Sequence, residues 1–370
     1  MDVKFIDLQK QHGGINYPEI MHIIKTGQFV GSDLFEERFA NYHGVKYCVG
    51  VGSGTDALWL SLLALGIGPG DKVIVPANTF IATPFAVSHV GAEPVFCDVD
   101  PHGYIMSGEQ LSKIEMTEDI KAIIPVHMYG HPCHMGEVLG FAKKYGLKVI
   151  EDCAQATGAE IFDRKVGTFS QAGCFSFYPT KNLGGLGQGG AIITDDESLA
   201  MTVRELGNVG RATGSWDEYA HIGFNSRLDA VNAKFLETNL RYLDQWNNKR
   251  IARANQYEAE LEELEDVFTP APPIKGFIKP VYHVYELKLD SKRTRTWLMK
   301  HLNKRGIPAR LHNSIPCHKQ PMYKDLGAKC PNTDEQANTL MSLPMHPYLT
   351  EEEVKYVCDN IKEWFAKRKK

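Results

Sequence analysis

The first 200 residues alternate between short apolar runs and longer stretches with helical spacing. The apolar runs are bounded by Gly, Pro or Asp, and most are apolar on both faces, as in Val73–Val75. A strand has this character when helices cover both sides of its sheet. We therefore predict a mainly parallel central sheet with strands at Tyr47–Val51, Lys72–Pro76, Pro94–Asp98, Ala122–His127, Lys148–Asp152, Gly173–Tyr178 and Ala191–Thr194.

Helix-like stretches lie between these runs. Thr55–Leu65 repeats Ala and Leu at helical spacing, and Met135–Tyr145 is followed by Gly146, which suits a helix C-terminus. This regular alternation of strands and helices predicts an α/β fold.

The pattern changes after about residue 228, where a long charged helical stretch covers Asp229–Glu265. Four residues that break regular structure come next, Pro270, Pro272, Pro273 and Gly276. The rest reads as one strand and two helices, at Val281–Leu289, Arg293–Arg305 and Glu351–Lys367. We predict a large α/β domain over residues 1–245 and a small C-terminal α+β domain over residues 246–370.

The 370 residues include 41 Lys and Arg against 45 Asp and Glu, so the formal net charge is -4. Such a chain has no global positive field to attract nucleic acid or an anionic membrane. No apolar run approaches the ~18 residues of a membrane span, and the start lacks the pattern of a secretory signal. We expect a cytoplasmic protein that binds phosphate through a local site.

Eight cysteines are scattered without a CxxC pair, and several lie inside apolar runs, which favours reduced, buried thiols. The run His131–His134 contains two His and one Cys but has no second half. We therefore expect no metal site there.

A glycine-rich turn joins the first predicted strand to the first long helix. Gly54, Thr55 and Asp56 stand at its helical end, where free backbone N–H groups and the helix dipole could hold a phosphate. The glycine spacing is neither that of a dinucleotide-binding loop nor that of a Walker A motif, and a tight turn explains it equally well.

A carboxylate and a lysine occupy loops at strand ends. Asp152 ends a predicted strand, where open α/β sheets form ligand clefts, although a helix cap would also place an Asp there. Lys181 enters Asn182–Gly190, whose glycines let a bulky ligand approach the backbone. With the phosphate-binding turn, these groups fit pyridoxal 5′-phosphate (PLP): the lysine forms a Schiff base and the Asp keeps the ring nitrogen protonated. Phe80 could lie on the ring face.

These motifs, in this order, resemble the DegT/DnrJ/EryC1/StrS family of sugar aminotransferases, in the fold-type I (aspartate aminotransferase-like) class of PLP enzymes. The resemblance covers nearly the whole chain. The matching segments are Phe5–Leu8, Gly27–Gly31, Gly52–Leu58, Pro76–Ala82, Glu151–Ala159, Phe175–Gly190, Gly223–Asp229 and Ser342–Pro347. The resemblance implies the three-layer fold of that class, and a homodimer in which each subunit completes the other's active site.

The resemblance also implies roles for the site residues. Lys181 is the Schiff-base lysine and the acid/base of the proton transfer, Asp152 pairs with the pyridine nitrogen, and Gln155 lies near the ring 3-hydroxyl. The phosphate is expected to be bound by Ser176, by the backbone at Gly54, Thr55 and Asp56 and, across the interface, by the partner subunit's Asn225.

Members of this family transfer an amino group, typically from glutamate, to a keto group of a nucleotide-linked sugar, and this chain looks most like members acting on 3-keto sugars. Arg227 either meets a carboxylate of the donor or of a uronate, or supports an interface. His312 and Asn313 lie in a loop that borders the sugar in this family, although packing explains His312 equally well.

Three positions depart from the family pattern and affect substrate preference rather than chemistry: Thr157, Gln188 and Asn232, where a bulky residue, Asp and Gln are usual. Three alternatives remain open. A PLP-dependent sugar dehydratase on this scaffold has His in place of the lysine, and Lys181 argues against it. A non-catalytic regulatory relative would have lost site residues that this chain retains. A PLP enzyme acting on amino acids alone is the third.

Overall fold

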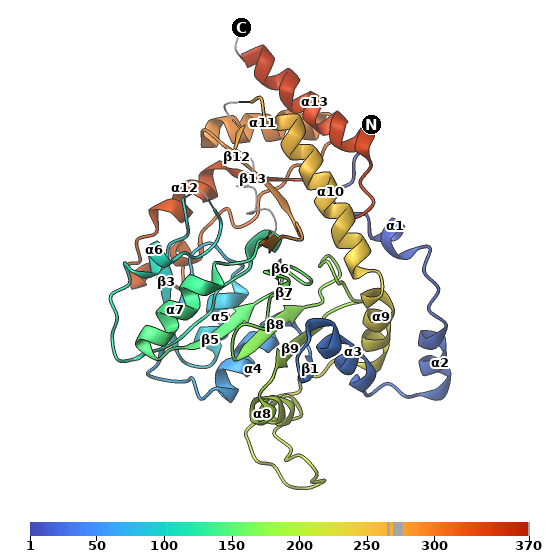
Figure 1. Ribbon diagram of the computed structural model, residues 1–370, viewed down its shortest axis with the longest axis vertical. Coiled ribbons are helices and arrows are strands. Elements are labelled where there is room, and N and C mark those ends of the chain that lie inside the picture. The colour runs from blue at the N-terminus through green and yellow to red at the C-terminus, as the bar shows by residue number, and fades with distance from the viewer. Residues whose placement is uncertain (102, 265–266, 269–276, 369–370) are drawn as a thin grey trace.

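The computed structural model describes residues 1–101, 103–264, 267–268 and 277–368. Its centre is a seven-stranded sheet with the order β1-β9-β8-β5-β4-β2-β3 (Figure 1). The strands are β1 (Tyr47–Val51), β2 (Lys72–Pro76), β3 (Glu93–Cys97), β4 (Ile120–Ile123), β5 (Lys148–Asp152), β8 (Ala172–Ser176) and β9 (Gly190–Thr194). Among these seven, only β9 runs antiparallel to its neighbours, so the prediction of a mainly parallel sheet is confirmed.

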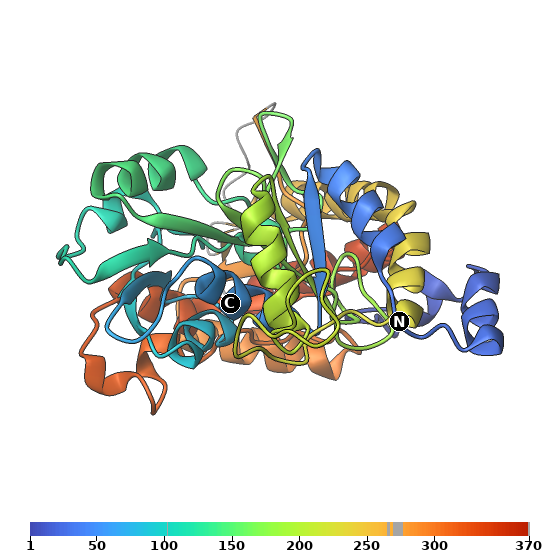
Figure 2. The same ribbon diagram turned by 90° about the horizontal axis from the view of Figure 1, so that it is seen from below.

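Helices cover both faces of this sheet (Figure 2). One face carries α4 (Gly54–Ala64), α5 (Ala82–His89) and α8 (Glu197–Gly207), and the other carries α3 (Asp33–His43), α7 (Met135–Tyr145) and α9 (Ala230–Leu240). Alternate residues of β2 divide between the two cores, with Val73 and Val75 in the first and Ile74 in the second. The α/β fold predicted from strands that are apolar on both faces is therefore confirmed.

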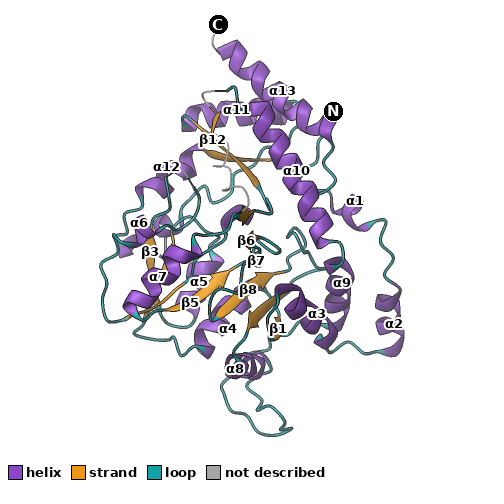
Figure 3. Cartoon of the chain, in the orientation of Figure 1, coloured by secondary structure: helices purple, strands orange, loops and turns teal. Residues whose placement is uncertain are grey.

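A smaller unit packs at one end of the large one, at the top of Figure 3. Its antiparallel sheet of β10 (Val267–Phe268), β12 (Tyr285–Leu289) and β13 (Leu340–Leu343) is packed with α10 (Leu243–Leu261), α11 (Lys292–Lys304) and α13 (Glu351–Arg368). The other elements are α1 (Leu8–His12), α2 (Pro18–Thr26), α6 (Gly108–Leu111), α12 (Pro331–Thr339), β6 (Glu160–Ile161), β7 (Arg164–Lys165), β11 (Ile278–Lys279), η1 (Met128–Gly130), η2 (Cys317–Lys319) and η3 (Lys324–Leu326). The boundary predicted between residues 245 and 246 falls inside α10, and this division into domains stays a prediction. The predicted chain-breaking residues Pro270, Pro272, Pro273 and Gly276 lie outside the described residues.

Three predicted elements differ from the structure by more than two residues, and several others differ by one or two. The helical stretch Asp229–Glu265 is two helices, because α9 packs in the core of the large unit and the end of α10 in that of the small one. The strand predicted at Val281–Leu289 begins at Tyr285, because Tyr282 turns the chain in a left-handed conformation with φ 43°. β4 stops before Pro125, which has no backbone N–H to give to a ladder.

No helix in the described part of the chain is both long and apolar enough to cross a membrane. All eight cysteines are buried and their thiols are free, as the sequence predicts.

Candidate active site

Asp152 is the last residue of β5 and is buried at the end of the sheet. Its Oδ2 accepts a hydrogen bond from Thr83 Oγ1 at 2.9 Å, and its Oδ1 accepts one from the backbone N–H of Ala154 at 3.1 Å. Thr83 is held in turn by Thr79, whose Oγ1 lies 2.8 Å away. Burial raises the pKa of Asp152, while these hydrogen bonds and the charge of Lys181 lower it.

Lys181 shares this environment. Burial lowers the pKa of Lys181 to about 8, although the charge of Asp152 acts in the opposite direction. A neutral amine is the form that attacks a carbonyl carbon or removes a proton, and near pH 8 this lysine holds both forms. The structure therefore brings the predicted lysine and carboxylate together, near enough for each charge to act on the other.

The loop that follows Lys181 is held by two asparagines. Asn182 is buried, and its Nδ2 donates to Asn247 Oδ1 at 2.8 Å and to the carbonyl of Val281 at 3.0 Å. Asn232 accepts from the N–H of Leu186 at 2.9 Å and donates to the carbonyl of Gln188 at 2.7 Å. The approach is so close that a Cβ at Gly185 would lie 2.3 Å from Asn232 Oδ1, which explains a glycine there.

The predicted phosphate site is at the start of α4. Ser53 caps the helix, because its Oγ accepts the N–H of Asp56 at 3.0 Å. The N–H groups of Gly54 and Thr55 have no hydrogen-bond partner within the described ranges. Ser176, from the end of β8, packs directly against this turn, since a Cβ on Gly54 would lie 2.6 Å from its Cβ. Two free amides and a hydroxyl thus meet at a helix N-terminus, which suits a phosphate.

Asp56 contributes its carboxylate to structure. Oδ2 accepts from Ser226 Oγ at 2.7 Å and Oδ1 from Trp59 Nε1 at 3.2 Å. Ser226 also accepts the N–H of Gly52 at 2.9 Å, so it ties its own segment to the glycine-rich turn.

Asn225 and Arg227 flank Ser226 but point the other way. Ser226 is buried, whereas both neighbours are exposed. Arg227 donates to Asn225 Oδ1 at 2.9 Å and to Asn208 Oδ1 at 3.0 Å, and these contacts leave the pair on the surface. The structure does not bring these two predicted residues into the cluster around Lys181 of their own chain.

Gln155 and Phe80 are the other two residues predicted to contact the ring. The Oε1 of Gln155 accepts the backbone N–H of Tyr129 at 2.7 Å, which leaves its amide NH₂ group to donate. Phe80 follows the segment that carries Thr79 and is 60% exposed, so its ring has a free face.

His312 and Asn313 lie in the segment after α11. Asn313 donates to Asn78 Oδ1 at 3.4 Å, and Asn78 directly precedes Thr79. Burial and the charges of Arg310 and Lys181 lower the pKa of His312 to about 4. These contacts bring the predicted sugar-binding loop to the same end of the sheet as Asp152.

A buried group of metal-ligand type, His127, Glu151 and Cys153, lies at the end of β5. Glu151 accepts from the backbone N–H groups of Gly167 and Phe169 at 2.8 Å each, and His127 Nδ1 accepts the N–H of Cys133 at 2.9 Å. The proton on His127 is then on Nε2, 3.2 Å from Glu151, so these polar atoms serve the fold.

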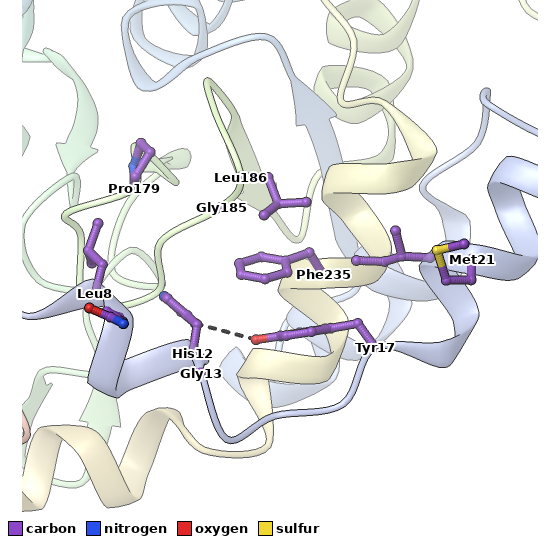
Figure 4. A pocket seen from close by; sticks show the side chains of 11 residues that line it. Leu8, His12, Gly13, Tyr17, Met21, Pro179, Gly185, Leu186 and Phe235 are labelled. Carbon is purple, nitrogen blue, oxygen red and sulfur yellow. Dashed lines mark hydrogen bonds between the residues drawn. The ribbon is translucent and has the colours of Figure 1, made fainter.

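An apolar groove of about 720 Å³ runs along the outer side of the Lys181 loop (Figure 4). Its lining side chains include Leu8 and His12 of α1, Met21 of α2, Leu186 of the loop and Phe235 of α9. Met21 and Leu186 are exposed.

The chain matches the model of the DegT/DnrJ/EryC1/StrS aminotransferase family over residues 20–362. It is 42% identical to the UDP-N-acetyl-3-dehydro-alpha-D-glucosamine 3-aminotransferase of Acidithiobacillus ferrooxidans, covering 88% of this chain and 86% of that one. It is 39% identical to the erythromycin biosynthesis sensory transduction protein EryC1 of Saccharopolyspora erythraea, covering 98% and 99%. The crystal structure of S. venezuelae DesV in complex with a ketimine intermediate matches with a TM-score of 0.93 at 36% identity, covering 98% of each chain. This chain belongs to the DegT/DnrJ/EryC1/StrS aminotransferase family.

Membership of this family implies a PLP cofactor, and another similar solved structure holds it as bound pyridoxamine phosphate. The residues present fit that group. The free amides of Gly54 and Thr55 and the hydroxyl of Ser176 match its phosphate, the buried Asp152 matches its ring nitrogen, and Lys181 its aldehyde. The sequence did not predict the roles of several supporting residues in this aminotransferase, because their hydrogen-bond partners are distant in the chain: Thr83, Asn182, Ser226, His283, Glu286 and Ser342.

Proposed function

We propose that this aminotransferase uses PLP to move an amino group from an amino acid, glutamate in the first instance, to the 3-keto group of a nucleotide-linked sugar. The observation that carries the proposal is the pairing of a half-buried, desolvated Lys181, partly neutral near pH 8, with the buried carboxylate of Asp152. The 3-keto acceptor is supported by the relative from Acidithiobacillus, whose name specifies a 3-dehydro UDP-sugar.

The chain supplies the groups that this reaction needs. PLP, when bound, withdraws electrons from the carbon that loses or gains a proton. Lys181 in its neutral form removes that proton and later returns it. Asp152 holds the ring nitrogen in its protonated form, and a cation there would in turn offset the rise in the pKa of Asp152 that burial causes.

The active unit is a homodimer that shares its sites. Asn225 and Arg227 point away from their own chain, which supports their assignment to the phosphate and the substrate of the other subunit. In the facing subunit, Asn225 would reach the phosphate held by the amides of Gly54 and Thr55, and Arg227 would reach a carboxylate of the substrate. The groove beside the Lys181 loop, with Met21 and Leu186 exposed, supplies apolar surface for such an interface.

A spectroscopic experiment tests this function. Purified protein loaded with PLP should show the visible absorption of a lysine-bound cofactor, and borohydride should fix the cofactor to the peptide containing Lys181. Glutamate should remove the visible band, and a UDP- or dTDP-linked 3-keto sugar should restore it. If PLP does not bind, the regulatory alternative, which the name of EryC1 also suggests, replaces the proposal. If glutamate bleaches the band and no keto sugar restores it, the enzyme acts on amino acids alone.

A further inference from the structure

Three side chains of the small unit form a hydrogen-bonded row that ends beside the candidate active site. Glu286 of β12 and Ser342 of β13 are paired in the antiparallel register, and both are buried. The Oγ of Ser342 lies 2.5 Å from Oε1 of Glu286 and 2.5 Å from Nδ1 of His312. Nδ1 of His312 is 3.7 Å from the same Glu286 oxygen, too far for a direct hydrogen bond, so the hydroxyl bridges the two groups.

The other ring nitrogen of His312, Nε2, has no hydrogen-bond partner in the part of the chain that the structure describes. The side chain is 37% exposed, whereas Glu286 is 2% exposed. Asn313 contacts Asn78, and the charge of Lys181 acts on the imidazole, so the half-exposed His312 ring lies next to the active site. The row therefore leads from a buried carboxyl to an accessible nitrogen.

Several elements place titratable or charged groups around this row. They are Lys181 and His283 from the site loops, Arg310 two residues before His312, and Tyr104 and Tyr129 near Glu286. Burial raises the pKa of Glu286 to about 8, and burial with Arg310 and Lys181 lowers that of His312 to about 4. At neutral pH the carboxyl therefore keeps its proton and the imidazole is neutral.

Such a row has two hydrogen-bond directions. When Glu286 is protonated, it donates to Ser342 Oγ, Ser342 donates to Nδ1 of His312, and the ring proton is on Nε2. When Glu286 is ionised, it accepts from Ser342, whose oxygen accepts from Nδ1–H, and Nε2 presents a lone pair. The protonation state of Glu286 thus determines whether Nε2 of His312 is a hydrogen-bond donor or a hydrogen-bond acceptor.

We propose that Glu286, Ser342 and His312 form a proton relay that serves the keto-sugar half of the reaction, with His312 as the catalytic residue and the other two as positioning residues. The relay rests on the proposed function. When nitrogen replaces the keto oxygen, that oxygen leaves as water, and both protons of the water come overall from the incoming amino group. The relay lends one proton to the leaving oxygen and takes one back from the nitrogen.

The proton transfers balance. The Nε2–H bond breaks as the leaving oxygen gains its proton, the Ser342 proton moves to Nδ1, and the Glu286 proton moves to Ser342. Glu286 is left ionised. The proton lost by the nitrogen then enters at Nε2, and the reverse shifts restore the starting state, so no oxidant, reductant or further reactant is needed.

Kinetics of the separated half-reaction test the relay. PLP-loaded enzyme is first converted with glutamate, freed of it, and mixed with the UDP-linked 3-keto sugar over a range of pH. The wild-type profile should combine a rise from deprotonation of Lys181 with a fall as pH increases through about 8, where Glu286 ionises. Glu286→Gln and Ser342→Ala should each slow the reaction at pH 7 by about tenfold or more, below the ~10²–10⁴-fold of a full general acid, and should lose that fall. The double variant should be no slower than the slower single one.

A control and a second readout separate this role from a structural one. Glu363→Gln, at a half-exposed carboxylate on α13 that pairs with Arg305, should leave the rate and its pH profile unchanged. Nitrogen-15 NMR of histidine-labelled wild type, with His312→Gln to assign the signal, should show the ring proton move from Nε2 to Nδ1 as pH rises through about 8. Glu286→Gln should stop that movement.

The two readouts distinguish the failures. A wild-type ring proton that stays on one nitrogen across this pH range overturns the relay, as does a descending pH limb that survives in both single variants, or losses that add in the double variant. If wild type transfers nothing to the keto sugar, the proposed function fails, and the NMR titration, which needs neither sugar nor a buried variant, still decides whether the row reverses.

Discussion

Thr83 supports the chemistry of the site, because its side chain hydrogen-bonds to the carboxylate of Asp152. A buried carboxylate loses hydration, and its ionised form persists only where donors replace that water. Thr83 Oγ1 and the N–H of Ala154 are the donors present, and Thr79 fixes the orientation of the first. The charge that Asp152 can offer a ring nitrogen thus depends on a residue outside every sequence motif.

Replacing Thr83 by Val should weaken the site without unfolding the protein. The pKa of Asp152 should rise, since a hydrogen bond to its charged form is lost, and turnover should fall about tenfold, given the ~1.5–3 kcal/mol of hydrogen bonds to charged groups. Thr79→Val is the matched control, because Thr79 contacts Thr83 and not the carboxylate, and its effect should be smaller. Steady-state kinetics at saturating PLP measures both, and equal effects would contradict this role for Thr83.

Lys181 should titrate well below an ordinary lysine. In cofactor-free protein its labelling by an acylating reagent, followed on the Lys181 peptide by mass spectrometry, should rise with pH through a midpoint of about 8, because only the neutral amine reacts. Asp152→Asn should lower that midpoint, since the carboxylate charge holds the pKa up. The exposed Lys148 is the comparison in the same digest. Identical midpoints for the two lysines would show that Lys181 is not desolvated.

Lys181→Ala should abolish both borohydride-stable attachment of the cofactor and amino transfer, with turnover lower by at least ~10²–10⁴-fold, since the acid/base is lost. Lys148→Ala should leave both unchanged. Attachment that persists in Lys181→Ala would transfer the role to another lysine.

The loop after Lys181 is the element on which the site depends. Its backbone is held by Asn232 through the N–H of Leu186 and the carbonyl of Gln188. A Cβ at Gly185 or at Gly189 would lie 2.3 or 3.0 Å from this side chain, so Asn232 favours glycine at both positions. Asn232 therefore affects the geometry of this loop, in addition to any effect on substrate preference.

Asn232→Ala should loosen this loop. Two hydrogen bonds are lost beside a buried backbone, so we expect a loss of about 1–3 kcal/mol in the free energy of unfolding and faster amide hydrogen exchange in residues 182–190. Asn338→Ala, at a helix surface where Asn338 bonds only Asp334, is the control. Denaturant titration and hydrogen-exchange mass spectrometry provide the two measurements. Unchanged exchange in the loop would mean that Asn232 does not hold it.

The bounds of some elements could be predicted from the sequence and those of others could not. β1, β2, β5 and α7 have the bounds that the sequence predicts, because their apolar patterns are local and end at Gly, Pro or Asp. The turn at Tyr282 and the break between α9 and α10 follow from tertiary contacts, such as the three carbonyls, one of them that of Tyr282, that Arg250 meets. Lys181 and Asp152 stood out by motif, whereas Glu286 and Ser342 are 56 residues apart and show their relation only in the folded strands.

The molecule as a whole has exposed features that its own active site does not use. Asn225, Arg227 and the groove beside α2 face outward, and a two-fold dimer would place such surfaces against the other copy. Neither Asn225 nor Arg227 reaches the Lys181 cluster within one chain. Catalysis by a single chain would leave both without a substrate contact.

Mixing two inactive variants tests shared sites. Lys181→Ala and Asn225→Ala dimers, each nearly inactive, should recover activity after their subunits are exchanged, because half of the random dimers then contain one intact site of two. The expected recovery is about a quarter of wild type for a two-fold dimer. Size-exclusion chromatography of the mixture confirms exchange. If activity does not recover after exchange, Lys181 and Asn225 act in the same chain.

The proposed amino transfer is tested most directly by following the amino nitrogen of glutamate into the sugar. PLP-loaded protein is incubated with ¹⁵N-labelled glutamate and a UDP- or dTDP-linked 3-keto sugar, and the nucleotide sugar is analysed by mass spectrometry. Wild type should form an amino sugar nucleotide that carries the label, and Lys181→Ala should not. A bound cofactor that consumes glutamate while the nucleotide sugar stays unlabelled would contradict it.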